Sequence, residues 1–431
     1  MTFFQTLTKL RSGQVDLIAY VTSFCDRIEA EEPKIQAIVP GTFDRQRILR
    51  SAAKLLESYP DIEKRPALFG LPVGVKDIFR VDRFPTRCGS ALPGHLFDGP
   101  EADCVQRLKR AGVIIMAKTV TTEFAFNEPG PTRNPYDPGR TPGGSSSGSA
   151  AGVASGFFPL ALGSQTVGSV IRPAAFCGVV GFKPSSGRIS LDGVIPYSAT
   201  ADHVGVFCQD SSGLGTLLKV MSDGWQPTNV QKPLKDIVFG VPEGPYFNRT
   251  APNGRAFFNQ QIERLTDAGY RIKPVQAFSD FKTIESDHTN LIAGEMARYH
   301  APWFKAQRHL YRPRTLAQIE KGLSIRDEAL EALRVKVRAL RKTVEAQMTA
   351  ASIDFWICPP ATDHAPQGLD STGDAVMNLP WTSSGLPAVT LPAGLDAIGM
   401  PQGVQVVARF MEDGRLIPVA DEMFKILANG R

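Results

Sequence analysis

The chain has 431 residues, 42% of them hydrophobic, and a net charge of +5. This length and apolar content allow one large α/β domain or two smaller domains. The 48 Lys and Arg residues are spread along the chain, which argues against a nucleic-acid-binding surface, and no run of 18 apolar residues predicts a membrane span.

Six cysteines are scattered through the sequence, with no Cys-x-x-Cys pair and no histidine at ligand spacing: Cys25, Cys88, Cys104, Cys177, Cys208 and Cys358. We therefore expect reduced, buried thiols rather than a zinc site, and we expect no metal or other cofactor. The N-terminus lacks a basic start followed by an unbroken apolar core, so a secretory signal is not predicted. Together these features predict a cytoplasmic protein.

Residues 1–60 are predicted to form a helical arm. Apolar residues at 17, 18, 21, 24 and 28 repeat at helical spacing, and residues 43–58 form a second amphipathic stretch. We expect this arm to pack against the main sheet. A wrapping or dimerising role is the alternative, and a homodimer is therefore possible.

Residues 67–240 are predicted to form the core of the fold. Strand-like apolar runs at 71–79, 113–118, 157–162, 179–183, 204–208 and 237–241 alternate with helical segments such as 104–111 and 149–154. This alternation predicts an α/β fold with a mixed β-sheet core covered by helices on both faces.

Residues 253–350 are predicted to be mostly helical, with 325–348 as the clearest helix, and to form a cap or side region. Strand character resumes at 354–359, 388–392 and 404–408, before a last helix at 413–427. Because residues 354–431 would then complete the sheet of the core, we expect residues 1–431 to form a single domain.

Lys76 interrupts an apolar alternating run that reads as a buried strand. A lysine in such a strand loses solvation, which lowers its pKa toward the range where it is neutral and can act as a base. The alternative is a gatekeeper lysine on a strand at the edge of the sheet.

The segment 141–185 is rich in serine and glycine but also carries many apolar residues, so we expect it to be folded and buried rather than a flexible linker. Ser145 follows two glycines, and Ser169 follows Gly168. Glycine permits turns whose backbone N–H groups can converge on an oxyanion, and an unactivated serine needs a nearby base. The sequence therefore suggests a triad of Lys76, Ser145 and Ser169, although turn or helix-capping serines are the alternative.

Two other serine motifs match known patterns less well. GSSSG at 144–148 fits a nucleophile elbow with Ser146 as nucleophile, but the proline-rich residues 134–142 before it cannot form the strand that an elbow requires. Ser-x-x-Lys occurs at 51–54 and 279–282 without the other motifs that accompany it in penicillin-binding proteins. We interpret both Ser-x-x-Lys matches as coincidences.

Three stretches together resemble the amidase signature family of serine hydrolases: LFGLPVGVKDIF, TRNPYDPGRTPGGSSSGSAAGVA and GSQTVGSVIRPAAFCGVVGFKPS. The resemblance is specific from about residue 68 to 190 and continues more weakly at 385–394 and 400–420. It implies the fold of that family and a Ser-cisSer-Lys triad of Lys76, Ser145 and Ser169, with a cis peptide bond before Ser145. The two serines are 24 positions apart, as the resemblance requires.

The resemblance also implies roles around the nucleophile. Backbone N–H groups of Thr166, Val167, Gly168 and Ser169 are expected to form the oxyanion hole. Arg172 and Ser147 are expected near the substrate, with Arg172 contacting a carboxylate or carbonyl and Ser147 helping to position Lys76 or Ser145. Val167 stands where the family usually has glycine, and Gln165 where it often has aspartate, so the shape of the pocket floor is left open.

The resemblance implies a metal-independent amidase that hydrolyses a small-molecule amide through an acyl-enzyme, with no nucleic-acid or membrane partner. The alternatives are the A-type component of a tRNA-dependent amidotransferase, which would need a partner protein, and a carbamate or ester hydrolase on the same fold. A non-catalytic binding protein is disfavoured because all three triad residues are present. Substrate specificity is expected to lie in residues 253–350 and 370–381.

Overall fold

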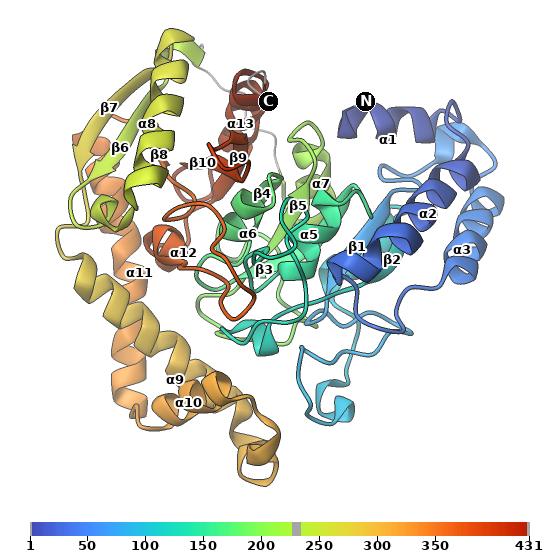
Figure 1. Ribbon diagram of the computed structural model, residues 1–431, viewed down its shortest axis with the longest axis horizontal. Helices are drawn as coiled ribbons and strands as arrows, with labels where there is room; N and C mark the ends of the chain where they lie inside the picture. The colour runs from blue at the N-terminus through green and yellow to red at the C-terminus, as the bar shows by residue number, and fades with distance from the viewer. Residues whose placement is uncertain (1, 226–233, 429–431) are drawn as a thin grey trace.

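The computed structural model describes residues 2–225 and 234–428 and is built around one ten-stranded mixed sheet (Figure 1). The strand order is β2-β1-β3-β5-β4-β9-β10-β8-β6-β7. The strands are β1 (Pro72–Lys76), β2 (Ile114–Thr119), β3 (Leu160–Gln165), β4 (Val180–Lys183), β5 (His203–Cys208), β6 (Val238–Glu243), β7 (Arg271–Gln276), β8 (Phe355–Cys358), β9 (Ala388–Leu395) and β10 (Pro401–Val407).

Parallel pairing joins the strands at both ends of the sheet, and antiparallel pairing joins those in the middle. Strands β2, β1 and β3 are parallel, as are β8, β6 and β7. The strands from β3 through β5, β4, β9 and β10 to β8 pair antiparallel. The predicted mixed α/β sheet is therefore confirmed, and the C-terminal strands complete it as expected.

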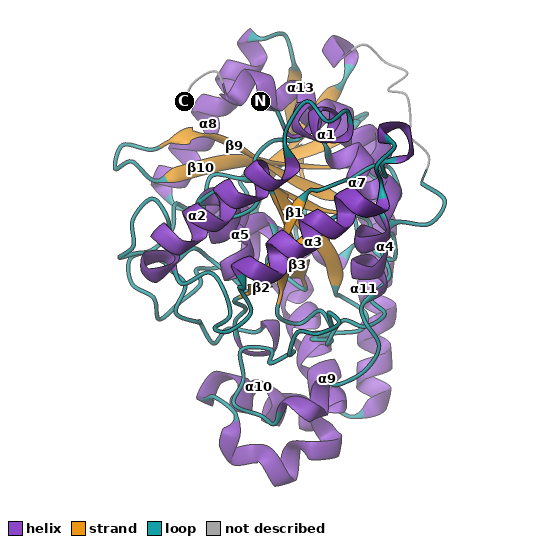
Figure 2. Ribbon diagram, turned by 90° about the vertical axis from the view of Figure 1, so that its right-hand side faces the viewer, coloured by secondary structure: helices purple, strands orange, loops and turns teal. Residues whose placement is uncertain are grey.

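Helices cover both faces of this sheet (Figure 2). They are α1 (Phe3–Arg11), α2 (Leu17–Ile35), α3 (Arg45–Ser58), α4 (Asp103–Arg110), α5 (Ser147–Ala154), α6 (Ile171–Phe176), α7 (Leu214–Met221), α8 (Pro252–Asp267), α9 (Phe281–Gln307), α10 (Pro313–Leu323), α11 (Asp327–Ala350), α12 (Leu379–Ser383) and α13 (Asp413–Ala428). None of these helices is long and apolar enough to cross a membrane, within the part of the chain that the structure describes.

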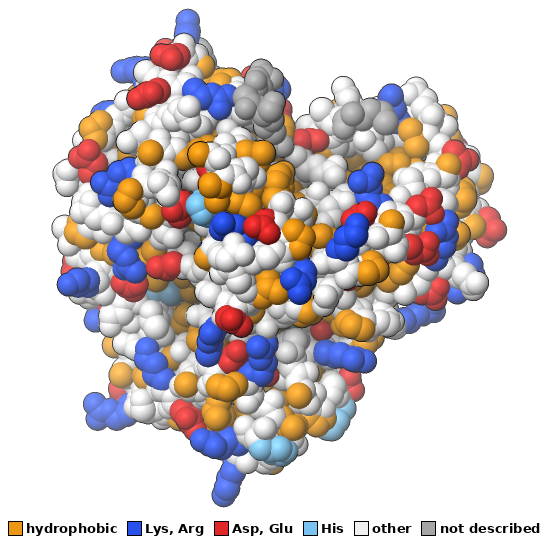
Figure 3. Space-filling view, viewed as in Figure 1, with side chains coloured by type: hydrophobic (Ala, Val, Ile, Leu, Met, Phe, Trp, Pro, Cys, Tyr) orange, Lys and Arg blue, Asp and Glu red, His pale blue; other side chains and the backbone are white. Residues whose placement is uncertain are grey.

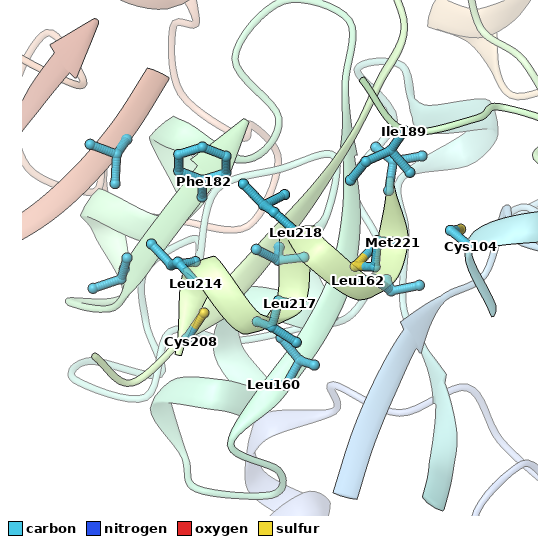
Figure 4. Close-up of a cluster of buried hydrophobic side chains, with 14 of the residues drawn as sticks. Cys104, Leu160, Leu162, Phe182, Ile189, Cys208, Leu214, Leu217, Leu218 and Met221 are labelled. Carbon is cyan, nitrogen blue, oxygen red and sulfur yellow. The ribbon is translucent and has the colours of Figure 1, made fainter. Parts of the chain in front are cut away.

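Alternation along β3 explains how the two faces acquire separate cores. Leu160 and Leu162 point to one face, where Leu214, Leu217 and Leu218 of α7 pack over them (Figure 4). Residue 161 between them belongs to the other buried cluster, together with apolar residues of α2, α3, α5 and α6. Because successive side chains of a strand point to opposite faces, one strand contributes to both cores.

The N-terminal helices pack on the sheet, as predicted. Val21 of α2 and Ile48 of α3 lie in one buried cluster with Met116 of β2. The side chains of Asp16 and Asp44 accept hydrogen bonds from the first turns of α2 and α3, which fixes where these two helices begin.

The strand bounds differ from the predicted runs by up to three residues, as β1 and β3 illustrate, and one strand was not predicted. The run at 71–79 ends as a strand at Lys76, and the run at 157–162 becomes a strand only at Leu160 but continues to Gln165. β7 lies at the edge of the sheet inside the region expected to be helical. Its sequence RIKPVQ is largely exposed, so it lacks the apolar alternation of a half-buried strand, and a charged edge strand is typical of protection against aggregation.

The surface carries charges of both signs in a mixed pattern on the face shown in Figure 3. All six cysteines are buried and unpaired, as expected from their spacing. Helices α9, α10 and α11 extend away from the sheet at the lower left of Figure 1 and pack mainly on one another. The start of α9 nevertheless reaches the site described next.

Candidate active site

Strand β1 ends at Lys76, whose side chain is fully buried. β1 lies between β2 and β3, so Lys76 is not on an edge strand and the gatekeeper interpretation is wrong. Its Nζ donates hydrogen bonds to the hydroxyl oxygens of Ser145 (2.7 Å), Ser164 (2.8 Å) and Ser146 (3.0 Å). Ser145 and Ser146 precede α5 and Ser164 lies on β3, so three separate segments meet at this amine.

The surroundings of Lys76 disfavour its charged form. Burial lowers the pKa of its ammonium to about 7, and the nearby Asp202 carboxylate opposes this effect by raising the pKa. Within residues 2–225 and 234–428, no carboxylate forms an ion pair with Lys76. A substantial fraction of the amine is therefore neutral near pH 7, as a general base requires.

The peptide bond between Gly144 and Ser145 is cis, as predicted. The carbonyl of Gly144 accepts a hydrogen bond from Nη2 of Arg172 (2.7 Å), and the carbonyl of Ser145 accepts one from the N–H of Thr122 (3.1 Å). A Cβ at Gly144 would lie 2.7 Å from a methyl carbon of Thr372, so only glycine fits here. These two hydrogen bonds hold the backbone carbonyls before and after the Ser145 Cα, and so keep the Ser145 hydroxyl next to Lys76.

Ser169 lies on the loop between β3 and α6 and lines a pocket of about 270 Å³. Other walls of this pocket come from Thr166, Val167, Arg172, Tyr197 and His288. No hydrogen bond joins the hydroxyls of Ser145 and Ser169 among the described residues. In free enzymes such contacts are often loose and tighten only when the substrate binds.

The backbone of residues 166–169 has free donors. In the described part of the chain, none of the four N–H groups at 166, 167, 168 and 169 donates to a protein acceptor, although the loop is largely buried. Buried N–H groups are normally paired, so four in succession are a candidate oxyanion site. The Val167 side chain lines the pocket and removes none of these donors.

Gln165, which departs from the family pattern, has a clear structural role. Its Oε1 accepts hydrogen bonds from the N–H groups of Val170 (2.8 Å) and Ile171 (3.0 Å), and its Nε2 donates to Oγ1 of Thr382 (2.9 Å). A neutral amide thus satisfies free donors at the beginning of α6 while also binding α12. The departure leaves the loop well anchored.

Arg172 and Ser147 mainly bind the protein backbone. Arg172 lines the pocket, but its guanidinium donates to the carbonyls of Gly144 and Gly373 and to Oγ1 of Thr372, and burial lowers its pKa to about 10. Ser147 donates to the carbonyl of Gly143 (2.8 Å) and makes no hydrogen bond to Lys76. Apart from Ser145, the serines that contact Lys76 are Ser146 and Ser164. Neither contact was predicted from the sequence.

Two further groups near the loop were also missed. Asp202 accepts hydrogen bonds from the Thr166 hydroxyl (2.5 Å) and from the N–H groups of Tyr197 (2.8 Å) and Ser198 (3.1 Å). His288 binds the carbonyl of Thr166 through Nε2 (2.9 Å). Neither residue lies in a signature motif, and in sequence His288 is 122 positions from its partner, so no local pattern could have identified it. His203 binds the carbonyl of Ala201 through Nδ1 (2.7 Å).

Among the described residues, no group of three or more His, Cys, Asp or Glu side chains is placed to hold a metal ion. Ser146 is fully buried, accepts a hydrogen bond from Lys76, and is absent from the pocket wall. The segment before it is a loop rather than a strand, which argues against the elbow interpretation.

Comparison with known proteins finds relatives along nearly the whole chain. The A-type component of the glutamyl-tRNA(Gln) amidotransferase of Koribacter versatilis (strain Ellin345) is 29% identical, over 99% of this chain and 98% of the relative. The corresponding protein of Gloeothece citriformis (strain PCC 7424) is 28% identical, over 96% of this chain and 95% of the relative.

Solved structures share the fold. A crystal structure of an amidase superposes with a TM-score of 0.89 at 29% identity and covers 99% of this chain and all of its own. The peptide amidase PAM in complex with the competitive inhibitor chymostatin has a TM-score of 0.83 at 24% identity, over 97% of this chain and 96% of its own, and supports the fold alone. The family model named Amidase matches residues 19–417. This protein therefore belongs to the amidase signature family.

Proposed function

We propose that this protein is an amidase that hydrolyses the carbon–nitrogen bond of a small-molecule amide through an acyl-enzyme on Ser169. Neutral Lys76 takes the proton of Ser145, Ser145 takes the proton of Ser169, and Ser169 Oγ attacks the carbonyl carbon. The N–H groups at 166–169 then bind the oxyanion. As the carbon–nitrogen bond breaks, the proton returns through the relay to the leaving amine.

The second half-reaction repeats these steps with water. Lys76 and Ser145 accept a proton from the water that attacks the acyl-enzyme, the bond to Ser169 breaks, and its oxygen recovers a proton. The products are the carboxylic acid and the free enzyme. The whole reaction consumes one substrate and one water molecule, and the water enters only in this second half.

The observation that carries the proposal is the buried contact of Lys76 with Ser145 and Ser164. Ser164 lies two residues before a loop whose four N–H groups have no acceptor among the described residues. A lysine buried without a carboxylate partner is costly unless the neutral form is accessible, and strongly perturbed amines are typical of functional sites. The pocket volume of about 270 Å³ suits a small acyl group rather than a macromolecule.

A second candidate is the A-type component of a tRNA-dependent amidotransferase. It is favoured by relatives with that name that align over nearly their whole length at 26–29% identity. Such a component would pass ammonia to a partner and would co-purify with it. Hydrolysis of small amides by the purified chain, with a measured solution mass that excludes a bound partner protein, would argue against this candidate.

The test is hydrolysis by the purified chain of a panel of small amides, anilides, carbamates and esters, with Ser169→Ala and Ser145→Ala as variants. Ser155→Ala is the matched control, because Ser155 lies in the same Ser/Gly-rich segment and its hydroxyl has no hydrogen-bond partner among the described residues. We expect amides to be hydrolysed, the two site variants to be inactive, and the control to be unaffected. Full activity of Ser169→Ala would overturn the proposal, and faster turnover of esters or carbamates would change the substrate class.

A further inference from the structure

Each peptide group of the candidate oxyanion loop is held by its carbonyl. The peptide carbonyls at 165, 166, 167 and 168 all accept hydrogen bonds, and the four donors belong to different parts of the fold. They are His203 Nδ1 to Gln165 (3.3 Å), His288 Nε2 to Thr166 (2.9 Å), Thr382 Oγ1 to Val167 (2.5 Å) and the Arg172 N–H to Gly168 (3.0 Å). Two of these donors come from α9 and α12, which lie outside the signature motifs.

Holding a carbonyl also fixes the N–H of the next residue. In a planar trans peptide the C=O and N–H bonds point in opposite directions. Among the described residues the cis bond is at Gly144–Ser145, so the loop peptides are trans. The bond from His288 to the Thr166 carbonyl therefore orients the N–H of Val167, and the bond from Thr382 to the Val167 carbonyl orients the N–H of Gly168.

The hydrogen bonds of His288 determine its tautomer. The Thr166 carbonyl can only accept, so Nε2 must carry the proton, and Nδ1 then accepts from the hydroxyl of Ser383 (2.6 Å). The ring is fully buried, and burial lowers its pKa to about 4, so it stays neutral at ordinary assay pH. Ser383 thus fixes the ring with its one proton directed at the loop.

Thr382 links two anchors of the same loop. Its hydroxyl lies 2.5 Å from the Val167 carbonyl and 3.1 Å from the Asn378 carbonyl, so its one proton is shared in favour of the nearer, Val167. The same hydroxyl accepts a hydrogen bond from the side chain of Gln165 (2.9 Å). Gly168 completes the fit, since a Cβ there would lie 2.2 Å from Oδ1 of Asn378, which comes directly before α12. The loop is therefore packed closely against the segment that carries Thr382 and Ser383.

We propose that His288 and Thr382 are positioning residues that aim the N–H groups of Val167 and Gly168 at the oxyanion of the reaction. This inference rests on the proposed function. A positioning residue of this kind acts on the transition state more than on substrate binding, because the negative charge on oxygen develops only during attack. Its loss lowers kcat and leaves KM nearly unchanged.

The test compares His288→Gln with His288→Phe in steady-state kinetics on the best amide substrate. The amide of Gln can place a donor near the position of Nε2, whereas Phe fills the space without a donor. We expect His288→Phe to lower kcat about 10- to 100-fold, since complete loss of one oxyanion donor costs about 100- to 1,000-fold, and His288→Gln to recover most of the rate. Thr382→Val should lower kcat in the same way with little change in KM.

His300→Phe is the matched control. His300 lies on the same helix, is fully buried, and hydrogen-bonds Tyr311 through Nδ1 (2.9 Å) rather than the loop. We expect this variant to lose thermal stability as much as His288→Phe does while keeping its kcat. If His288→Phe fails to fold, Ser383→Ala replaces it, because removing the Ser383 hydroxyl releases the ring without creating a large void, and a fall in kcat alone is again expected.

Three outcomes would overturn the inference: a normal kcat in both His288→Phe and Thr382→Val, an equal loss in His300→Phe, or no rescue by Gln in a variant of normal stability. A different result would refute the proposed function. If Ser169→Ala stays active, the oxyanion loop has no reaction to serve, whereas an essential Ser169 with normal rates in the His288 variants removes only the positioning role.

Discussion

The proposed base role of Lys76 predicts a specific dependence of rate on pH. Burial lowers the pKa of its ammonium from 10.5 to about 7. For that pKa roughly one tenth of the amine is neutral at pH 6 and roughly nine tenths at pH 8. The kcat/KM of the wild-type protein should therefore rise about tenfold between pH 6 and 8 and then level off.

Substitutions of Lys76 distinguish a residue that acts as a base from one that only carries a positive charge. Lys76→Met should remove the rising limb and lower the rate by at least about 100-fold, the usual size of a general-base contribution. Lys76→Arg should fail equally, because a guanidinium stays protonated throughout this range. Near-normal turnover of Lys76→Arg with an unchanged pH profile would refute the assignment.

The same pKa shift predicts how stability changes with pH. Between pH 7 and 10.5 the unfolded chain keeps a proton on Lys76 that the folded chain has released, so the folded state gains stability as pH rises, by about 1.4 kcal/mol per pH unit. The wild type should show this gain relative to Lys76→Met in urea unfolding at pH 7.5 to 9.5. The gain would be absent if the lysine were ordinarily charged in the folded protein.

Lys183 provides the control for both measurements. It is also fully buried, and burial lowers its pKa to about 7. It donates to the backbone carbonyls of Pro184 and Leu386 rather than to the serines around Lys76. The wild type should gain stability with rising pH relative to Lys183→Met by the same slope as relative to Lys76→Met, but Lys183→Met should keep the rising limb of the rate. Loss of that limb in Lys183→Met would mean that the limb does not report on Lys76.

Three further predictions concern Ser169, Asp202 and Gly168. An active-serine phosphonate should label Ser169, as mass spectrometry of the digested protein would show, and label on Ser146 would instead revive the elbow interpretation. Asp202→Asn should move the rising limb to lower pH, because the Asp202 carboxylate raises the pKa of Lys76; a limb that moves upward would contradict that coupling. Gly168→Ala should lower kcat by more than about tenfold, since its Cβ would lie 2.2 Å from Oδ1 of Asn378 and displace the loop, and a normal kcat would show that the loop tolerates this movement.

The sequence predicted the parts of this site that lie within short motifs. Burial of Lys76 followed from the apolar residues on both sides of it, and the cis bond at Gly144–Ser145 followed from the family resemblance. The same local reasoning placed β3 too early, because Phe157 and Phe158 are as apolar as a strand but are buried in the turn after α5. Apolar content alone does not distinguish a buried turn from a buried strand.

Partners brought together by the fold could not be predicted. His288 lies 122 residues from Thr166, and Thr382 lies 215 residues from Val167. A neutral histidine inside a helix has no pattern that separates it from a core residue, and a hydroxyl in a short helix reads as a cap. Ser164 was missed for a different reason: its contact with Lys76 depends on which strands are neighbours, and periodicity does not give strand order.

The three serines around Lys76 are suitable partners for the proposed buried base. A carboxylate partner would hold the amine in its charged form, whereas hydroxyls can accept from an ammonium and can also donate to the lone pair of a neutral amine. The nearest carboxylate in sequence, Asp77, is paired instead with buried Lys118 (2.8 Å). Ser145, Ser146 and Ser164 then satisfy the hydrogen bonds of Lys76 in either protonation state. A change that brought a free carboxylate into this cluster, such as Ser164→Asp, would therefore raise the pKa of Lys76 and keep its amine charged, even if Lys76, Ser145 and Ser169 stayed in place.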